Sequence, residues 1–372
     1  MAPISIETAP AAAPIDELKN LSLKSAPVTT KPQWFSQTGR PESEYPYKAL
    51  LPIWDFGTKY PALTEFTHAD PGLEAKKHAD PRAFLSAATV DELTPRFGSE
   101  VRGVQLTELD AAGRQQLALF VAQRGVVVFR DQDFVDADPA WHVRDWGTFF
   151  GRPHIHPVSG HPKGIPEFHL VYRAPKAGED TYYDAFTTTL NGVRWHSDVT
   201  YELQPPGLTA LFLYDSPPSG GDTGYADQRE AYNRLSPSFA AYLETLQVLH
   251  SGVAQAEVAK KHNAPPRREP VENVHPLVRR HPVTGEKALF VNRQFSRHIV
   301  GLKQEESDAI LNLLYDHIEK GSDFQVRLRW EPRSVVLWDN RITAHNANVD
   351  FDNLGFRRHG ARITPQAERP FL

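Results

Sequence analysis

The sequence predicts a mainly β protein, a β-barrel or sandwich with helices on its outside. Short segments with a strand pattern outnumber the helical segments, and the two do not alternate strictly as they do in doubly wound folds. The chain has neither a Gly-rich phosphate loop nor a Ser nucleophile elbow. Its 372 residues are 40% hydrophobic and 23% charged, which suits a globular chain with a sizeable core.

Strands are predicted where apolar residues alternate or form short β-branched runs. In chain order, the predicted strands are 99–106, 125–130, 195–200, 207–214, 288–292, 334–338 and 357–364. Helices are predicted from helical spacing of apolar residues and from start signals such as Asp138-Pro139. The predicted helices follow the 99–106 strand, begin at 139, cover 226–247 in two pieces broken at Ser236-Pro237, and cover 305–318. The paired glycines at 220–221 predict a turn.

The N-terminal part differs in composition from the rest. Residues 1–30 are rich in Ala, Pro, Ser and Thr, which predicts a disordered tail. Residues 31–85 carry aromatic residues among prolines and are too apolar for a free linker, so we expect an irregular arm that wraps the domain. Residues 86–372 are expected to form one domain, since no repeat or linker divides them.

Charge and cysteine content exclude several classes of protein. The net charge of −5 shows no basic excess, which argues against nucleic acid and anionic membranes as partners. The chain has no cysteine, so disulfides are impossible and a metal site must use His, Asp or Glu, a set that suits iron better than structural zinc. No signal peptide or long apolar run is recognisable, and we expect a cytoplasmic protein. The oligomeric state stays open, a homo-oligomer included.

The segment Trp195 to Thr200 contains the strongest candidate for chemistry. On a strand, residues two apart point to the same face, so His196 and Asp198 are expected to project together. Such a pair supplies two ligands of the 2-His-1-carboxylate triad of non-haem iron, which leaves coordination positions open. We nominate the distant His345 as the third ligand.

The His-x-Asp pattern alone is not specific, because about one chance match is expected in a chain of this composition. The chain has two more, ending at Asp70 and Asp80. Each is followed directly by proline in a polar region without strand pattern. We interpret both as loop carboxylates at turns, outside the barrel.

Three further features are candidates for binding an anion or a metal ion. Arg358 and Arg362 lie four apart on a predicted strand and share a face, which would make an anion-binding wall; an exposed basic strand end is the alternative. Thr223, in the Gly-Gly turn, has a hydroxyl suited to a bound carboxylate, or it is an ordinary turn residue. His154 and His156 stand between two prolines and could be metal ligands or hold an anion; the alternative is a structural or exposed pair.

Taken together, these segments resemble the taurine/2-oxoglutarate dioxygenase (TauD/TfdA) family of Fe(II) enzymes, and within it the sulfonate dioxygenases of fungal type. The matching segments stand in the family's order between about residues 95 and 365: 195–200, 205–207, 220–223, 275–276, 288–292, 338–341, 345 and 357–362. The resemblance implies a double-stranded β-helix, a jelly-roll-like barrel with the metal inside one mouth.

The resemblance also implies roles for single residues. They are His196, Asp198 and His345 as iron ligands, Arg358 and Thr223 for the far carboxylate of 2-oxoglutarate, Arg362 and a protonated or donor His156 for the substrate sulfonate, and Phe295 as an aromatic lining the substrate pocket. One position departs from the pattern. Gly192 stands where taurine enzymes have an asparagine near the substrate, so we expect weaker preference for taurine over other sulfonates.

The function implied by the resemblance is oxidation of a small organosulfonate such as taurine. With Fe(II), 2-oxoglutarate and O₂, the enzyme would hydroxylate the carbon next to the sulfonate, and the product would release sulfite and an aldehyde. The same chemistry on an aryloxyacetate or an alkyl sulfate ester is one alternative. A non-catalytic β-barrel binding protein is another, and oxygen-dependent release of succinate separates it from the enzyme.

Overall fold

The computed structural model describes residues 45–372 with the exception of 54, 56, 174–194, 262–263 and 352–353. The contact pattern separates Met1–Gln33 from Trp34–Leu372, and every described residue belongs to the second unit. The predicted tail and the position of Gly192 therefore lie outside the described residues. Within the described part, no helix has the length and apolar character needed to cross a bilayer.

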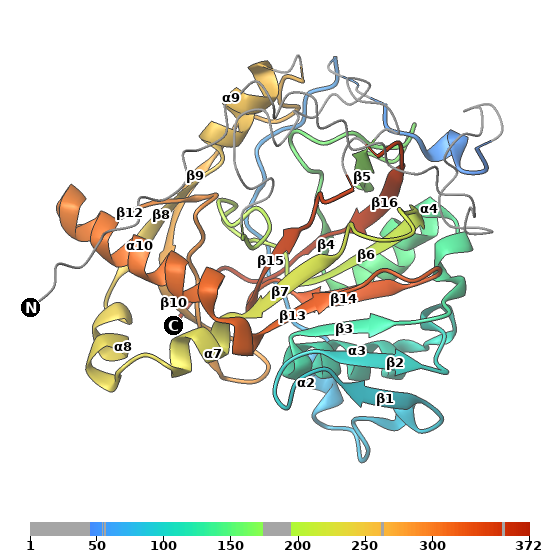
Figure 1. Cartoon of the computed structure of the whole chain (residues 1–372), viewed down its shortest axis with the longest axis horizontal. Coiled ribbons are helices and arrows are strands. Elements are labelled where there is room, and N and C mark those ends of the chain that lie inside the picture. The colour runs from blue at the N-terminus through green and yellow to red at the C-terminus, as the bar shows by residue number, and fades with distance from the viewer. Residues whose placement is uncertain (1–44, 54, 56, 174–194, 262–263, 352–353) are drawn as a thin grey trace, which may run out of the picture. The chain divides into compact units, whose positions relative to one another are not determined.

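Two sheets form the centre of the described unit (Figure 1). The larger has seven strands in the order β1 (Thr89–Glu92), β2 (Ser99–Arg102), β3 (Val126–Phe129), β14 (Val335–Asp339), β6 (Leu208–Asp215), β16 (Arg358–Ile363) and β5 (His169–Arg173). The smaller has β13 (Gln325–Leu328), β7 (Thr223–Asp227) and β15 (Thr343–Ala347). All neighbouring strands in both sheets are antiparallel except β2 and β3.

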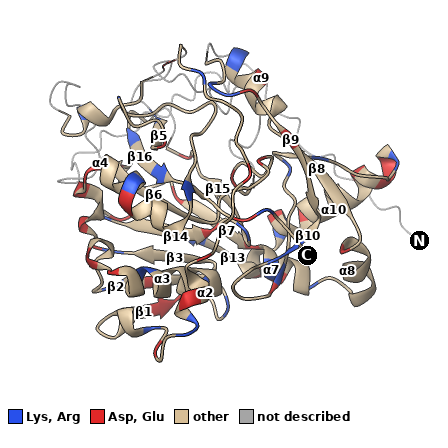
Figure 2. Ribbon diagram, turned by 180° about the vertical axis from the view of Figure 1, so that it is seen from behind, with Lys and Arg blue, Asp and Glu red and all other residues tan. Residues whose placement is uncertain are grey.

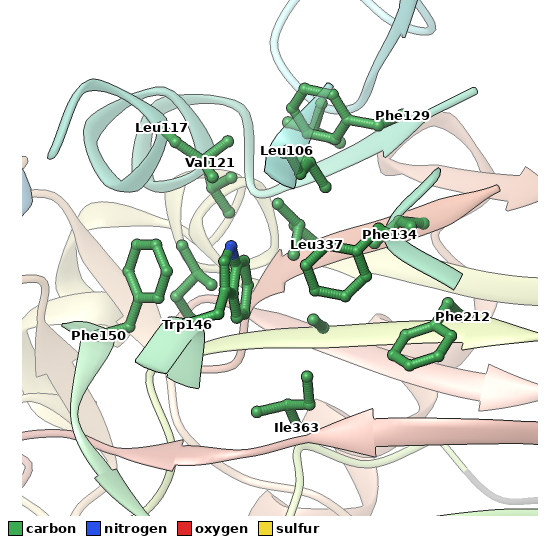
Figure 3. Packing of buried hydrophobic residues seen from close by; sticks show 14 of the residues in the cluster. Leu106, Leu117, Val121, Phe129, Phe134, Trp146, Phe150, Phe212, Leu337 and Ile363 are labelled. Atoms are coloured by element: carbon green, nitrogen blue, oxygen red, sulfur yellow. The ribbon is translucent and has the colours of Figure 1, made fainter. Parts of the chain in front are cut away.

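Each face of the large sheet has its own apolar core. Between the two sheets, one cluster joins Leu211 and Leu213 of β6 to Trp338 of β14 and Tyr225 of β7. Because side chains alternate along a strand, the residues between them on β6 point the other way. There Phe212 belongs to a second cluster, which also contains Trp146 and Val121 of α3 (Figure 3). The space between the sheets is thus where inward-facing side chains of β6, β7, β14 and β16 meet.

Helices cover the outer face of the large sheet. α3 (Ala111–Arg124) begins at Asp110, whose side chain accepts a hydrogen bond from Gly113 N, and ends at Gly125, where φ is 74°. The other short helical segments of this half are η2 (Lys48–Leu50), α2 (Gly72–Ala75), η3 (Ala83–Leu85), η4 (Leu106–Glu108), η5 (Asp133–Asp136), α4 (Pro139–Trp141), η6 (His142–Gly147) and α5 (Thr148–Phe150). Asp138 caps α4 as expected, accepting from Ala140 N.

The remaining elements lie outside the two central sheets, and most of them contribute side chains to a third apolar cluster. They are α7 (Gln228–Asn233), α8 (Pro237–Leu243), β8 (Gln247–Ser251), α9 (Val253–Lys261), β9 (Glu272–Pro276), β10 (Val278–Arg280), β11 (Lys287–Leu289), β12 (Ser296–Ile299), α10 (Gln304–Lys320) and η7 (Ser322–Phe324). Two short strands, β4 (Arg152–Pro153) and β17 (Pro365–Gln366), pair with each other. Basic and acidic residues are interspersed over the described ribbon (Figure 2).

Most predicted elements are confirmed, several of the strands being shorter than expected, but the strand predicted at 195–200 is wrong. His196 makes a single bridge to His345, and the chain then turns at residues 198–200. Val199 has φ of 40°, which is unusual for a β-branched residue. The turn is held from outside, because the Asn340 side chain accepts a hydrogen bond from Asp198 N at 2.7 Å and donates one to Asp198 O at 3.1 Å.

Residues 45–85, the part of the predicted arm that the structure describes, contain little regular structure. Tyr45 is buried and bonds His359 Nδ1 through its hydroxyl at 2.7 Å, and Phe66 N donates to Gln204 Oε1. Asp70 stands at a turn as expected, but it is buried and paired rather than a free loop carboxylate. It is 8% exposed, and its Oδ2 is 2.6 Å from Nη1 of the buried Arg341.

Candidate metal centre and anion site

Three predicted ligands come together although they span 150 positions of the chain. The ligand atoms of His196, Asp198 and His345 all lie within 4.8 Å of one another. Each histidine Nε2 is 3.7 Å from Asp198 Oδ1. Backbone hydrogen bonds in both directions between His196 and His345, at 3.0 and 2.7 Å, place the two rings side by side.

The segment after β14 holds the turn that carries the carboxylate. Asn340 fixes the backbone of Asp198 from both sides, as described above. The residues on either side of Asn340 pair with each other: Arg341 donates to Asp339 through Nε–Oδ1 at 2.8 Å and Nη2–Oδ2 at 2.6 Å. The buried His281 also bonds Asp339 Oδ2, at 2.9 Å. In the sequence, Asn340 stands out only as part of the 338–341 segment. Its hydrogen bonds to the backbone of Asp198 are visible only in the structure.

The ionisation of the three residues suits a divalent cation. Burial opposes ionisation of Asp198, but Arg362, followed by His345 and His196, holds the pKa of its carboxyl below the ordinary value. Burial, with the neighbouring His196, keeps the pKa of His345 well below its ordinary value. The site therefore offers an ionised carboxylate and a neutral imidazole, which are the forms that bind metals.

Unpaired atoms within the cluster fit a bound metal. Asp198 Oδ2 is buried without a hydrogen-bond partner in the described structure. The ring of His345 is held by packing, with the Trp338 and Tyr225 rings centred 5.1 and 5.9 Å away. Two imidazoles and one carboxylate, with no thiolate, form the donor set typical of mononuclear non-haem Fe(II).

Arg358 of β16 presents a buried cationic edge without an anion. It is 3% exposed, and its Nε and Nη2 have no hydrogen-bond partner among the residues that the structure describes. No carboxylate of the described residues lies within ion-pair distance, and burial lowers the pKa of Arg358 to about 10. These two nitrogens share one edge of the guanidinium, the fork that matches a carboxylate. A buried charge without a partner is costly, so a bound anion is the simplest account of it.

Thr223 supplies a buried hydroxyl, and Trp330 lies near both this hydroxyl and the Arg358 guanidinium. Thr223 begins β7 and is 1% exposed. Trp330 Nε1 donates to its Oγ1 at 3.1 Å, and the Arg358 guanidinium lies 5.9 Å from the Trp330 ring. Indole N–H can only donate, so the hydroxyl proton of Thr223 is left for an acceptor such as a carboxylate.

Arg362 lies between the metal ligands and a pair of histidines. Its Nη1 is 2.7 Å from Asp198 Oδ1, and its Nη2 is 2.9 Å from His169 Nδ1. The His169 ring is centred 4.4 Å from that of His156. Sequence reasoning missed His169, which belongs to no motif and is placed only by the register of β5 against β16, where it pairs with Arg362.

His156 reaches this group as a neutral donor. Burial, and then the charge of Arg362, keeps its pKa well below the ordinary value, which favours the donor form of His156 over the protonated form. Val158 N donates to His156 Nδ1 at 3.3 Å, which places the proton on Nε2. Phe295 is 1% exposed and lies edge-on to His196, with ring centroids 6.2 Å apart.

Comparisons with known proteins agree with this arrangement. The family model described as "Taurine catabolism dioxygenase TauD, TfdA family" matches residues 89–364. An "Alpha-ketoglutarate-dependent sulfonate dioxygenase" of Saccharomyces cerevisiae is 45% identical over 334 residues, which cover 89% of this chain and 80% of the yeast protein. An "Alpha-ketoglutarate-dependent dioxygenase cnsP" of Penicillium expansum is 41% identical over 332 residues, 87% of either chain.

A solved structure extends the agreement to the fold. The crystal structure of a taurine dioxygenase from Burkholderia xenovorans matches with a TM-score of 0.61 and 34% identity, over 76% of this chain and 91% of that one. The two facing sheets of the described unit are thus those of the double-stranded β-helix, which confirms the predicted fold.

Proposed function

The chain belongs to the taurine catabolism dioxygenase TauD, TfdA family, and we propose that it is an Fe(II)- and 2-oxoglutarate-dependent dioxygenase that hydroxylates a small organosulfonate. The observation that carries this proposal is the combination of two features in one interior. These are the triad of His196, Asp198 and His345, and the unpaired guanidinium edge of Arg358. A binding protein with structural histidines would need neither.

His196, Asp198 and His345 would hold the metal, and Asn340 would keep the carboxylate in place. When bound, Fe(II) supplies the redox chemistry that couples oxidation of a 2-oxo acid by O₂ to hydroxylation of a C–H bond. The surrounding residues hold the reactants in position, which is the protein's main contribution to such a reaction.

Arg358 and Thr223 would hold the far carboxylate of 2-oxoglutarate. The two unpaired nitrogens of Arg358 pair with its two oxygens, and the Thr223 hydroxyl donates a further bond. Thr223 belongs to the small sheet and Arg358 to the large sheet, so residues of both sheets would hold the far end of the cosubstrate. Its reacting end is left to extend toward the triad.

Arg362 and the Nε2–H of His156 would receive the substrate anion, with Phe295 beside them. A sulfonate stays ionised at physiological pH and has three acceptor oxygens, so it can use both donors. The yeast relative is named for a sulfonate substrate and the Burkholderia structure for taurine, which favours a sulfonate over a carboxylate. Hydroxylation next to sulfur gives a product that releases sulfite and leaves an aldehyde.

The test is a panel of alkylsulfonates, alkyl sulfate esters and aryloxyacetates, each supplied with Fe(II), 2-oxoglutarate and O₂. We expect taurine or a related sulfonate to release sulfite and succinate in equal amounts, and Arg362→Ala to suppress sulfite far more than 2-oxoglutarate binding. A sulfate ester would release sulfate instead. Turnover of aryloxyacetates with no sulfite from any sulfonate would contradict the substrate but not the dioxygenase. No succinate with any substrate would contradict the enzyme.

The division of the chain also remains a proposal. We assign residues 86–372 to the dioxygenase domain and 31–85 to an arm that wraps it, with 1–30 as a tail. The contacts of Tyr45, Phe66 and Asp70 with the domain support the arm.

A further inference from the structure

Tyr225 is a buried phenol whose hydroxyl finds no partner in the described part of the chain. It lies in β7, is 0% exposed, and among the described residues its hydroxyl makes no hydrogen bond. Folded proteins pair nearly all buried polar groups, because an unpaired one keeps its full desolvation cost. A hydroxyl of this kind indicates either a tolerated cost or a group that a ligand completes.

The surroundings of Tyr225 favour a ligand. Thr223 and Tyr225 stand two apart on β7, so both face the space between the sheets. Tyr225 is opposite His345 in the register, and the two rings stack with centroids 5.9 Å apart. Among the described residues, the charged side chains that influence the pKa of its hydroxyl are Asp198, Arg358 and Arg362. Each of them belongs to the candidate metal or anion site.

A second buried tyrosine, Tyr214, lies away from the candidate site and serves as a comparison. Tyr214 of β6 is 7% exposed, and its hydroxyl is also unpaired within the described structure. It faces the opposite side of the large sheet, against Tyr47 and His359, with ring centroids 4.7 and 5.0 Å away. The two residues are therefore matched in burial and in hydrogen bonding and differ in the face they occupy.

We propose that the Tyr225 hydroxyl is a further cosubstrate-binding group, which donates a hydrogen bond to the 2-oxoglutarate carboxylate held by Arg358. The inference rests on the proposed function. A carboxylate has about four acceptor positions, so the fork of Arg358 leaves room for Thr223 and for one more donor. A phenol is protonated at neutral pH and can fill that place without adding charge.

The test compares Tyr225→Phe with Tyr214→Phe. The Mn(II)-loaded proteins are titrated with 2-oxoglutarate by calorimetry without oxygen, and the melting temperature is measured with neither present. Both substitutions remove an unpaired hydroxyl, so neither should lower the melting temperature of the free protein. Tyr225→Phe should weaken 2-oxoglutarate binding about tenfold or more, since it loses a bond to a charged acceptor. Tyr214→Phe should bind as the wild type does.

The outcomes separate this inference from the proposed function. If Tyr225→Phe binds 2-oxoglutarate within twofold of wild type while Arg358→Lys is weakened, the role of Tyr225 is overturned and the dioxygenase stands. A lower melting temperature of Tyr225→Phe with unchanged binding also overturns it, because the hydroxyl is then structural. If the wild-type protein binds no 2-oxoglutarate, both proposals fail.

Discussion

Replacing Asp70 with alanine is expected to destabilise the protein without removing its metal. Asp70 belongs to one of the two His-x-Asp pairs that we assign no chemistry, yet it is buried against Arg341. Its Oδ1 accepts a bond from Gly72 N at 2.7 Å, and its Oδ2 pairs with Arg341 Nη1 at 2.6 Å. The substitution removes both contacts.

The expected loss of unfolding free energy depends on the hydrogen-bond partners that Arg341 keeps in the variant. Losing a charge-assisted hydrogen bond costs roughly 1.5–3 kcal/mol, and the bond to Gly72 adds roughly 0.5–1.5 kcal/mol. Arg341 still has Asp339, and Glu368 Oε2 at 3.2 Å, so the charge is not stranded and the loss stays below the full cost of breaking a buried pair. We expect about 2–4 kcal/mol, or about 3–6 °C in melting temperature for a domain of roughly 330 residues.

Asp80 provides the matched control. It stands in the same His-Ala-Asp-Pro sequence but is exposed, and its side chain accepts one bond, from Arg82 N at 2.9 Å. Asp80→Ala should cost about 0.5 kcal/mol. Urea denaturation and metal-binding stoichiometry are measured for both variants. Equal stability of the two would refute the argument from burial, and loss of metal from Asp70→Ala would refute our choice of the triad.

Three more predictions follow from the site and the core. Asp198→Ala should abolish stoichiometric Fe(II) or Mn(II) binding at neutral pH, and retention of one tightly bound ion would exclude Asp198 as a ligand. Arg358→Lys keeps the charge but loses the fork, so 2-oxoglutarate affinity measured by calorimetry should fall about ten- to a hundredfold, whereas unchanged affinity would move Arg358 out of the site. Burial lowers the pKa of His142 to about 4, so the native state keeps this ring neutral while the unfolded chain takes up a proton below about 6.5. The free energy of unfolding should therefore drop as pH falls from about 6.5 toward 4, and His142→Phe should flatten that slope; an identical slope in the variant would contradict the assignment.

The metal ligands were predictable from sequence, though partly for the wrong reason. His196 and Asp198 were expected to share a face of one strand, whereas the structure brings them together by a bridge followed by a turn. The positive φ of Val199 is not visible in a β-branched sequence that favours strands. The motif was still informative, because a strand and a bridge followed by a turn can both bring the side chains of His196 and Asp198 to one metal ion.

What the sequence could not predict depends on register between distant strands. His169 meets Arg362 because β5 pairs with β16, and Tyr225 stacks on His345 because β7 pairs with β15. A shift of one residue in either pairing would turn these side chains to the opposite face, and no local pattern records which register is adopted. Asp70 reaches Arg341 across 271 positions from a segment without strand structure, and no local pattern predicts that ion pair either. Residues such as His169 and Tyr225, which meet the site from neighbouring strands, are therefore found from the strand pairing, while the metal ligands are found from the motif. This difference explains why the candidate donors His169 and Tyr225 belong to no motif that the sequence reveals.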